Sequence, residues 1–432
     1  ASDQSQIGNA ITATASNPVI MTTAVTTDAR IDVSSNTVAA TARGNQAANS
    51  QSPDALDLTS AEDGTWLSTG TFGVDAFAPV LVASLQRTQA APVTAKVIGS
   101  RIAAENGQVV DSAVTVADNR QEAVALANDA ANALSLTRID GGSGAGIASR
   151  QSVGTGSPVL SRMSGKVEVI AQGAVDSALR LDGNLQRSMA YGNAAANALA
   201  ANAVTLATPT SWGFASIVSG YGSPEVSAAY SLLSDQSTQS RVKASTDGGY
   251  RLLVRQLATG SEMSADANAI IAAGYGNQSA NAATLDGVDI GAEYGFGAIA
   301  NVTNVQRAKA AVSAETSGAT KVWLANDSVE ARVAADRNAI QAVATANLAS
   351  GNQLEVHATS IGNGNNGWGG GGEGPGGVIG TAGLGHGNVL TVTAPLSVQN
   401  AQTFRAPVSA VVQDSMTRIT DWGAFVNSSG WV

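Results

Sequence analysis

The chain has 432 residues, a formal net charge of −10, 44% hydrophobic residues, only 4% aromatic residues, 47 glycines and no cysteine. Its apolar residues are largely alanine and valine, which argues against a thick core of large side chains and favours an architecture in which the backbone approaches itself repeatedly. The acidic balance and the lack of any basic cluster along the chain argue against a nucleic-acid partner. The absence of cysteine excludes disulfides, thiolate metal sites and cysteine nucleophiles.

The start of the chain and its polar composition favour an exported protein. The first residue is Ala1 rather than methionine, as in a mature protein after cleavage of a signal peptide, although a trimmed chain would look the same. No run of about 18 uncharged apolar residues is present, so we expect no membrane-spanning helix and expect any membrane attachment to go through a partner. Only 13% of the residues are charged, which leaves Ser, Thr, Asn, Gln and Gly to cover the surface and favours an extracellular structural protein.

An asparagine pattern recurs five times along the chain. In the first copy an asparagine is followed by a second one nine residues later and a third one four residues after that. The matching residues are Asn36, Asn45 and Asn49; Asn119, Asn128 and Asn132; Asn184, Asn193 and Asn197; Asn268, Asn277 and Asn281; and Asn338 and Asn347, with Gly351 in the last place. The leading asparagines lie 83, 65, 84 and 70 residues apart, which indicates a long and uneven repeat.

The segments around each box alternate in hydrophobicity. The segment 112–118, for example, alternates before a polar turn, which is typical of a strand. The box 122–136 would also suit a helix on alanine propensity, but glycine precedes the second asparagine in three copies and β-branched residues are frequent between boxes. We therefore predict an all-β fold, an elongated β-solenoid (β-helix) with five irregular long repeats. With about 20 to 24 residues in a coil, each repeat would hold three or four coils, and the chain would form a rod on the order of 90 Å long.

The C-terminal part departs from the repeat. Residues 362–388 are too rich in glycine to hold one conformation alone, so we expect a loop or hinge there. The segment 389–432 resumes strand character and ends in an aromatic tail that would serve as a cap or a docking peptide. The predicted organisation is therefore a repeat-containing β-solenoid over 1–361, a Gly-rich loop over 362–388, and C-terminal strands over 389–432.

Motifs for catalysis and cofactor binding are weak in this sequence. Residues 362–367 match G-x-G-x-x-G, but the glycines that follow Trp368 leave no helix to bind a dinucleotide. The two histidines, His357 and His386, lie about thirty residues apart and are interpreted as surface residues.

Four turn aspartates are candidates for a ligand site, because acidic residues lined along one face of β-helical lyases and epimerases bind calcium or a uronate. These residues are Asp118, Asp182, Asp266 and Asp336. Being whole repeats apart, they would lie roughly three coils from one another, so we interpret them as Asx turns. We predict no catalytic, cofactor-binding or metal-binding residues.

The Gly-Asn-x-x-x-Asn box, as in 191–200 and 275–285, is similar to the steps of curlin-type secreted β-solenoid repeats. With the chain length, the lack of cysteine and the Trp-Gly tract, the whole chain resembles the holdfast attachment protein D family (HfaD) of stalked bacteria. The resemblance implies a cell-surface protein attached to the outer membrane at the cell pole, where it anchors the adhesive holdfast polysaccharide. It also implies two partners, a curlin-like anchor subunit (HfaA) and an outer-membrane secretion-channel lipoprotein (HfaB), and it brings no catalytic residues.

The chain ends and the tryptophans are the candidate contacts with partners and ligands. A β-solenoid exposes unpaired backbone at its first and last coils, so another β-subunit could add there. Trp66, Trp212 and Trp323 are either corner fillers or platforms for sugars, and Trp422 and Trp431 lie in the aromatic tail.

Two classes of function are consistent with the sequence. The first is a non-catalytic anchor that binds extracellular polysaccharide. The alternative is a β-helical polysaccharide-active enzyme, a lyase or epimerase, or else a generic secreted adhesin. An enzyme would require acidic and basic side chains to converge in a groove within one or two coils.

Overall fold

The computed structural model describes most of the chain. The described residues are 2–54, 65–68, 74–78, 80–137, 144–206, 215–219, 224–290, 298–324, 328–361, 378–381, 391–393 and 396–420. They contain strands and no helix, so the predicted all-β class is confirmed and the helical interpretation of the box is wrong.

The strands form five sheets. The largest has eleven strands and includes six parallel ones: β1 (Ser2–Ile7), β8 (Val80–Gln89), β12 (Ala145–Val153), β18 (Pro224–Thr238), β24 (Ala298–Ala308) and β32 (Leu396–Phe404). Its other strands are β6 (Thr65–Ser68), β7 (Val74–Ala78), β17 (Ala215–Ser219), β30 (Val378–Thr381) and β31 (Thr391–Thr393).

An eight-stranded sheet lies next along the chain. Its strands are β2 (Ile11–Ser16), β3 (Val19–Thr27), β9 (Val93–Val110), β13 (Val159–Val175), β19 (Val242–Val254), β20 (Ala258–Thr259), β25 (Val312–Leu324) and β33 (Val408–Thr420). A five-stranded sheet follows, with β4 (Arg30–Ser34), β10 (Ala113–Ala117), β14 (Ala178–Asp182), β21 (Glu262–Ser264) and β26 (Arg332–Ala334).

The last two sheets carry the asparagine boxes and a short continuation. The boxes form β5 (Thr37–Gln51), β11 (Arg120–Thr137), β15 (Leu185–Asn202), β22 (Ala269–Asp286) and β27 (Ala339–Ala349), with β28 (Gln353–His357) beside β22. The continuation consists of β16 (Thr205–Leu206), β23 (Asp289–Ile290) and β29 (Ser360–Ile361).

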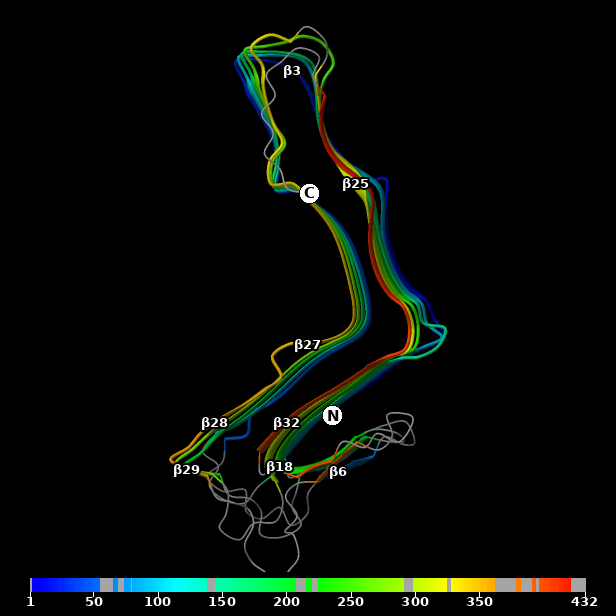
Figure 1. Ribbon diagram of the computed structural model, residues 1–432, viewed down its shortest axis with the longest axis vertical. Helices are drawn as coiled ribbons and strands as arrows, with labels where there is room; N and C mark the ends of the chain where they lie inside the picture. The colour runs from blue at the N-terminus through cyan, green and yellow to red at the C-terminus, as the bar shows by residue number, and fades with distance from the viewer. Residues whose placement is uncertain are drawn as a thin grey trace, which may run out of the picture.

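The chain passes through these sheets in the same order in each repeat. β8, β9, β10 and β11 are followed by β12, β13, β14 and β15, and each strand pairs in parallel with its counterpart one repeat later. In Figure 1 the successive turns therefore superimpose along one bent outline.

The size of the turn differs from the prediction. One whole repeat makes a single turn, because the box strand that follows Asn119 (β11) pairs directly with the box strand that follows Asn184 (β15) in the next repeat. The expectation of three or four coils in each repeat is therefore wrong. With at most six strands stacked about 4.8 Å apart, the stack is roughly 25 to 30 Å high, well short of the predicted rod. No sheet closes on itself among the described residues, and the β-solenoid stays a prediction.

Two apolar clusters fill the space between the sheets. One contains Val93, Val159, Val242 and Val312 at equivalent places in successive turns, and the other contains residues such as Leu134 and Leu199. Both clusters include many buried alanines, so the small side chains allow the sheets to lie close together.

The C-terminal strands extend the same sheets. β32 pairs in parallel with β24, and β33 pairs in parallel with β25. Within the predicted Gly-rich loop only Val378–Thr381 is described, and it pairs antiparallel with β18 and with β31.

Candidate functional site

The predicted asparagines form three columns that run through the stack. In the first column the side-chain amide Nδ2 of each asparagine donates to Oδ1 of the asparagine in the next turn. The donor–acceptor distances are 2.9 Å from Asn36 to Asn119, 2.9 Å from Asn119 to Asn184, 2.9 Å from Asn184 to Asn268 and 3.0 Å from Asn268 to Asn338. The backbone N–H of each donor residue also donates to the same Oδ1 atom. This second hydrogen bond fixes the conformation of the turn before the box.

The second column joins two sheets. Its asparagines are linked from Asn45 through Asn128, Asn193 and Asn277 to Asn347, over distances of 2.7 to 2.8 Å. Four of these amides also donate across the molecule to backbone carbonyls of the eleven-stranded sheet, as Asn128 does to Ser152 at 3.0 Å.

The third column shows one error in the predicted pattern. Asn49, Asn132, Asn197 and Asn281 are linked in turn by distances of 2.7 to 2.8 Å. In the last turn the acceptor is Asn352, at 2.8 Å from Asn281, rather than the expected Gly351. Gly351 has a φ of +68°, which suits glycine and accommodates the extra residue before Asn352.

The turn aspartates lie much closer together than the separation of three coils that was predicted from the sequence. The backbone N–H of Asp266 donates to Oδ1 of Asp182 at 3.2 Å, and that of Asp336 donates to Oδ1 of Asp266 at 2.8 Å. They therefore lie on successive turns rather than three coils apart, because each repeat makes only one turn. Burial raises the pKa of the Asp182 carboxyl, and the neighbouring charge of Asp266 acts in the same direction. Within the described ranges no group of three or more His, Asp or Glu side chains is placed to hold a metal ion.

A glutamine column was missed by the sequence analysis. Its members are Gln4, Gln86, Gln151, Gln236, Gln306 and Gln402. From Gln86 onward each Nε2 donates to Oε1 of the glutamine in the preceding turn at 2.8 to 3.0 Å. The same amides cross to backbone carbonyls of the box strands, as from Gln151 to Ala194 at 2.6 Å. The glutamines lie outside the boxes, so the spacing of the asparagines gave no signal for them.

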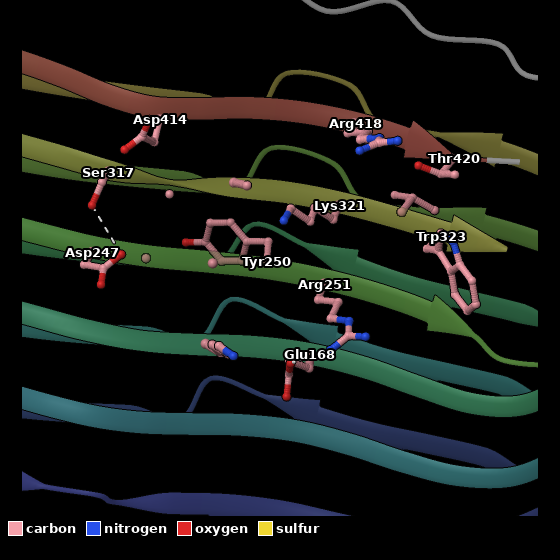
Figure 2. A pocket seen from close by; sticks show the side chains of 16 residues that line it. Glu168, Asp247, Tyr250, Arg251, Ser317, Lys321, Trp323, Asp414, Arg418 and Thr420 are labelled. Carbon is pink, nitrogen blue, oxygen red and sulfur yellow. Dashed lines mark hydrogen bonds and ion pairs between the residues drawn. The ribbon is translucent and has the colours of Figure 1, made fainter.

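A groove of about 820 Å³ lies on the eight-stranded sheet and is lined by residues of β13, β19, β25 and β33. Figure 2 shows its side chains on successive parallel strands. Arg251, Lys321 and Arg418 occupy directly opposed positions, since Arg251 is in register with Lys321 and Lys321 with Arg418. We call these three residues the cationic column.

The groove is lined by four cations and by the carboxylates of Glu168, Asp247 and Asp414. Within the cationic column only Arg251 has an ion-pair partner among the described residues. Arg251 lies 3.9 Å from the carboxylate of Glu168, which is only 5% exposed and also accepts a 2.8 Å bond from Arg101. Among the described residues neither Lys321 nor Arg418 makes an ion pair. Like charges directly opposite each other across strands are unfavourable, so this column favours an anionic ligand.

An aromatic ring lies beside the column. Trp323 is two residues beyond Lys321 on β25, hence on the same face of the strand, and is 37% exposed. Figure 2 places its indole at the end of the groove near Thr420. At the other end Ser317 donates to the carboxylate of Asp247 at 3.2 Å.

The tyrosine of the groove is held in the interior. The Tyr250 side chain is 1% exposed, and its hydroxyl lies 2.7 Å from the carbonyl oxygen of Ala269 and 2.8 Å from that of Asn184. Burial raises its pKa well above the usual value. The phenol is therefore a structural donor to the backbone.

Of the predicted aromatic contacts, Trp323 is placed in the groove. Trp66 belongs to β6, but its side chain lies outside the described part of the structure, as do Trp212, Trp422 and Trp431 in full. The cationic column was missed because its members are far apart along the chain. A signal did exist, since Arg251 and Lys321 each precede the leading asparagine of the next box by 17 residues.

Comparison with known proteins adds no assignment. No family model, no curated protein and no solved structure matches this chain. Over the described ranges the chain also offers no helix with the length and apolar character needed to cross a bilayer.

Proposed function

We propose that this chain is a β-solenoid that acts as a non-catalytic cell-surface anchor and binds an anionic polysaccharide in the groove. The repeated passage through the same parallel sheets, with one repeat for each turn, supports the solenoid. In such a stack a side chain recurs at each turn at a spacing of about 4.8 Å, so columns of like residues arise on the surface.

The observation that carries the proposal is the cationic column beside Trp323. Three cations stand on neighbouring strands in a chain whose net charge is −10. An acidic sugar polymer supplies carboxylates to relieve their repulsion and ring faces to stack on the indole. Extended chains with repeated charges also gain affinity from several weak contacts made together.

The resemblance to the holdfast attachment family extends the proposal to location and partners. We propose attachment at the outer membrane, with a curlin-like subunit (HfaA) and a secretion-channel lipoprotein (HfaB) as partners. Co-purification of both from an outer-membrane fraction supports this part, and their absence from the complex contradicts it.

The binding test compares a uronate polymer, alginate, with neutral dextran by isothermal titration calorimetry. The wild-type chain is expected to bind alginate and not dextran, with affinity falling as salt rises from about 50 to about 200 mM. The double variant Arg251→Gln/Lys321→Gln is expected to bind at least about tenfold more weakly, because two charge-assisted contacts are lost.

The control carries the same change in charge on exposed residues outside the groove, Arg241→Gln/Lys309→Gln. It is expected to bind as the wild type does, and circular dichroism verifies that both variants are folded. Equal binding by the two double variants, or no binding by the wild type, contradicts the proposal. Shortening of the alginate during incubation favours the enzyme alternative.

A further inference from the structure

We infer that the acidic polymer lies across the strands, along the axis of the stack, so that one sugar carboxylate meets one cation in each turn; this inference rests on the proposed function of the groove. It narrows the ligand to extended polymers that carry a carboxylate on every sugar. Arg251, Lys321 and Arg418 stand on successive strands, so their backbone positions are about 4.8 Å apart. In an extended 1,4-linked sugar chain successive sugars advance by about one ring length, which is similar to this spacing.

The charges of the groove are divided along the strands. Asp247 lies four residues before Arg251 on β19, and Asp414 lies four residues before Arg418 on β33. Four residues of strand span roughly 13 Å. Figure 2 shows the two carboxylates at one end of the groove and the cations further along the same strands. A polymer that followed the strands would therefore pass over carboxylates as well as cations, whereas a polymer that crosses the strands meets the cations alone.

An apolar ridge flanks the cationic column on the side away from the two carboxylates. Trp323 is in register with Leu253, and Leu253 is in register with Ile170. Leu253 and Ile170 are only 3% and 6% exposed, whereas Trp323 is 37% exposed, so the indole is the part of this ridge that a ligand can reach. A sugar above Lys321 therefore has a cation for its carboxylate and an aromatic ring for its own ring two residues away on the same strand.

Glu168 marks the first end of the column. It stands opposite Arg251 on β13, and its carboxylate pairs with Arg101 at 2.8 Å and with Arg251 at 3.9 Å. A sugar carboxylate at this turn would meet a like charge. The column therefore offers consecutive subsites from Arg251 to Arg418, which lies on the last strand of this sheet among the described residues.

Alginate and hyaluronan test this arrangement, because alginate carries a carboxylate on every sugar and hyaluronan on every second sugar. Hyaluronan carboxylates are about two strand spacings apart, roughly 10 Å, so they meet Arg251 and Arg418 and leave Lys321 beside a neutral sugar. Lys321→Gln is expected to weaken binding of an alginate hexamer at least about fivefold and that of a hyaluronan hexamer less than about twofold. Arg251→Gln is expected to weaken both by similar factors. The measurement is isothermal titration calorimetry.

The matched control is Lys309→Gln, which makes the same change on an exposed lysine outside the groove and is expected to bind both hexamers as the wild type does. Circular dichroism verifies that the variants are folded. Equal weakening of both hexamers by Lys321→Gln, or no weakening of either, overturns the inference and leaves the proposed function standing. A wild-type chain that binds neither hexamer contradicts the proposed function itself and the inference with it.

The direction of the polymer is tested separately by Asp247→Asn/Asp414→Asn, which removes two charges and keeps the shape of the side chains. A polymer on the cationic column lies roughly 13 Å from both positions, beyond the screening length of about 8 Å at about 150 mM salt, so alginate is expected to bind within about twofold of the wild type. A gain in affinity of more than about fivefold indicates a polymer that runs along the strands and overturns the inference.

Discussion

At the scale of the residue, the amide side chain is what makes the long turns stack in register. Asparagine carries two donor hydrogens and one acceptor oxygen, so one side chain can bond to the turns on both sides and to the facing sheet. Asn193 illustrates this, because it accepts from Asn128, donates to Asn277 at 2.8 Å and donates to the carbonyl of Ser237 at 3.0 Å. The boxes are therefore stabilising elements of the fold.

Replacing Asn193 by leucine is expected to lower the free energy of unfolding by about 2 to 4 kcal/mol, because buried polar groups on both neighbouring turns lose a partner. The measurement is urea denaturation followed by circular dichroism. Asn202→Leu, an exposed position on the same strand β15, is the control and is expected to cost less than about 0.5 kcal/mol. Similar losses for the two variants contradict the role assigned to the column.

Asp182 provides a pH-dependent test at the same scale. Burial raises its carboxyl pKa in the folded state, so the ionised form destabilises the fold at pH values above that raised pKa. Asp182→Asn removes the charge and keeps an oxygen to accept from the N–H of Asp266. The variant is expected to melt at a higher temperature than the wild type at neutral pH, and the difference is expected to shrink as the pH falls through the raised pKa toward the ordinary aspartate value. A variant that is less stable at neutral pH, or a gap that widens on acidification, contradicts this account.

At the scale of the element, the box strands and their flanks were predictable. Alternation in 112–118 predicted the strand β10, and the box after it forms β11. The number of strands in a turn was not predictable, because Pro92 marks only the start of β9, and the 18-residue strand then continues through Gly99 and Gly107, where the sequence pattern would end a strand. Its place is set by pairing with residues more than 60 positions away, which a local pattern does not contain.

The groove could not be predicted from the sequence for a related reason. Arg251, Lys321 and Arg418 become neighbours only when whole turns are aligned. Alignment on the boxes would have matched Arg251 with Lys321, but no box follows Arg418 to bring it into the same comparison. The exposure of Trp323 likewise depends on the side chains of the strands that pair with β25, which the local sequence does not contain.

At the scale of the whole molecule, one turn for each repeat explains both the amide columns and the groove. Columns of asparagine and glutamine give the stack a direction, and the same register gathers cations into the groove. The low aromatic content is consistent with this design, because close sheets require small side chains.

The register of the turns is most directly tested by a disulfide between two introduced cysteines, since the chain contains none of its own. Arg251→Cys/Lys321→Cys is expected to oxidise within one molecule, because directly opposed residues on parallel strands lie about 4.8 Å apart. Arg251→Cys/Ser317→Cys, displaced by four residues along β25, is expected to remain reduced under the same conditions. Failure of the first pair to oxidise, or equal oxidation of both pairs, would contradict the one-turn repeat on which the proposed function depends.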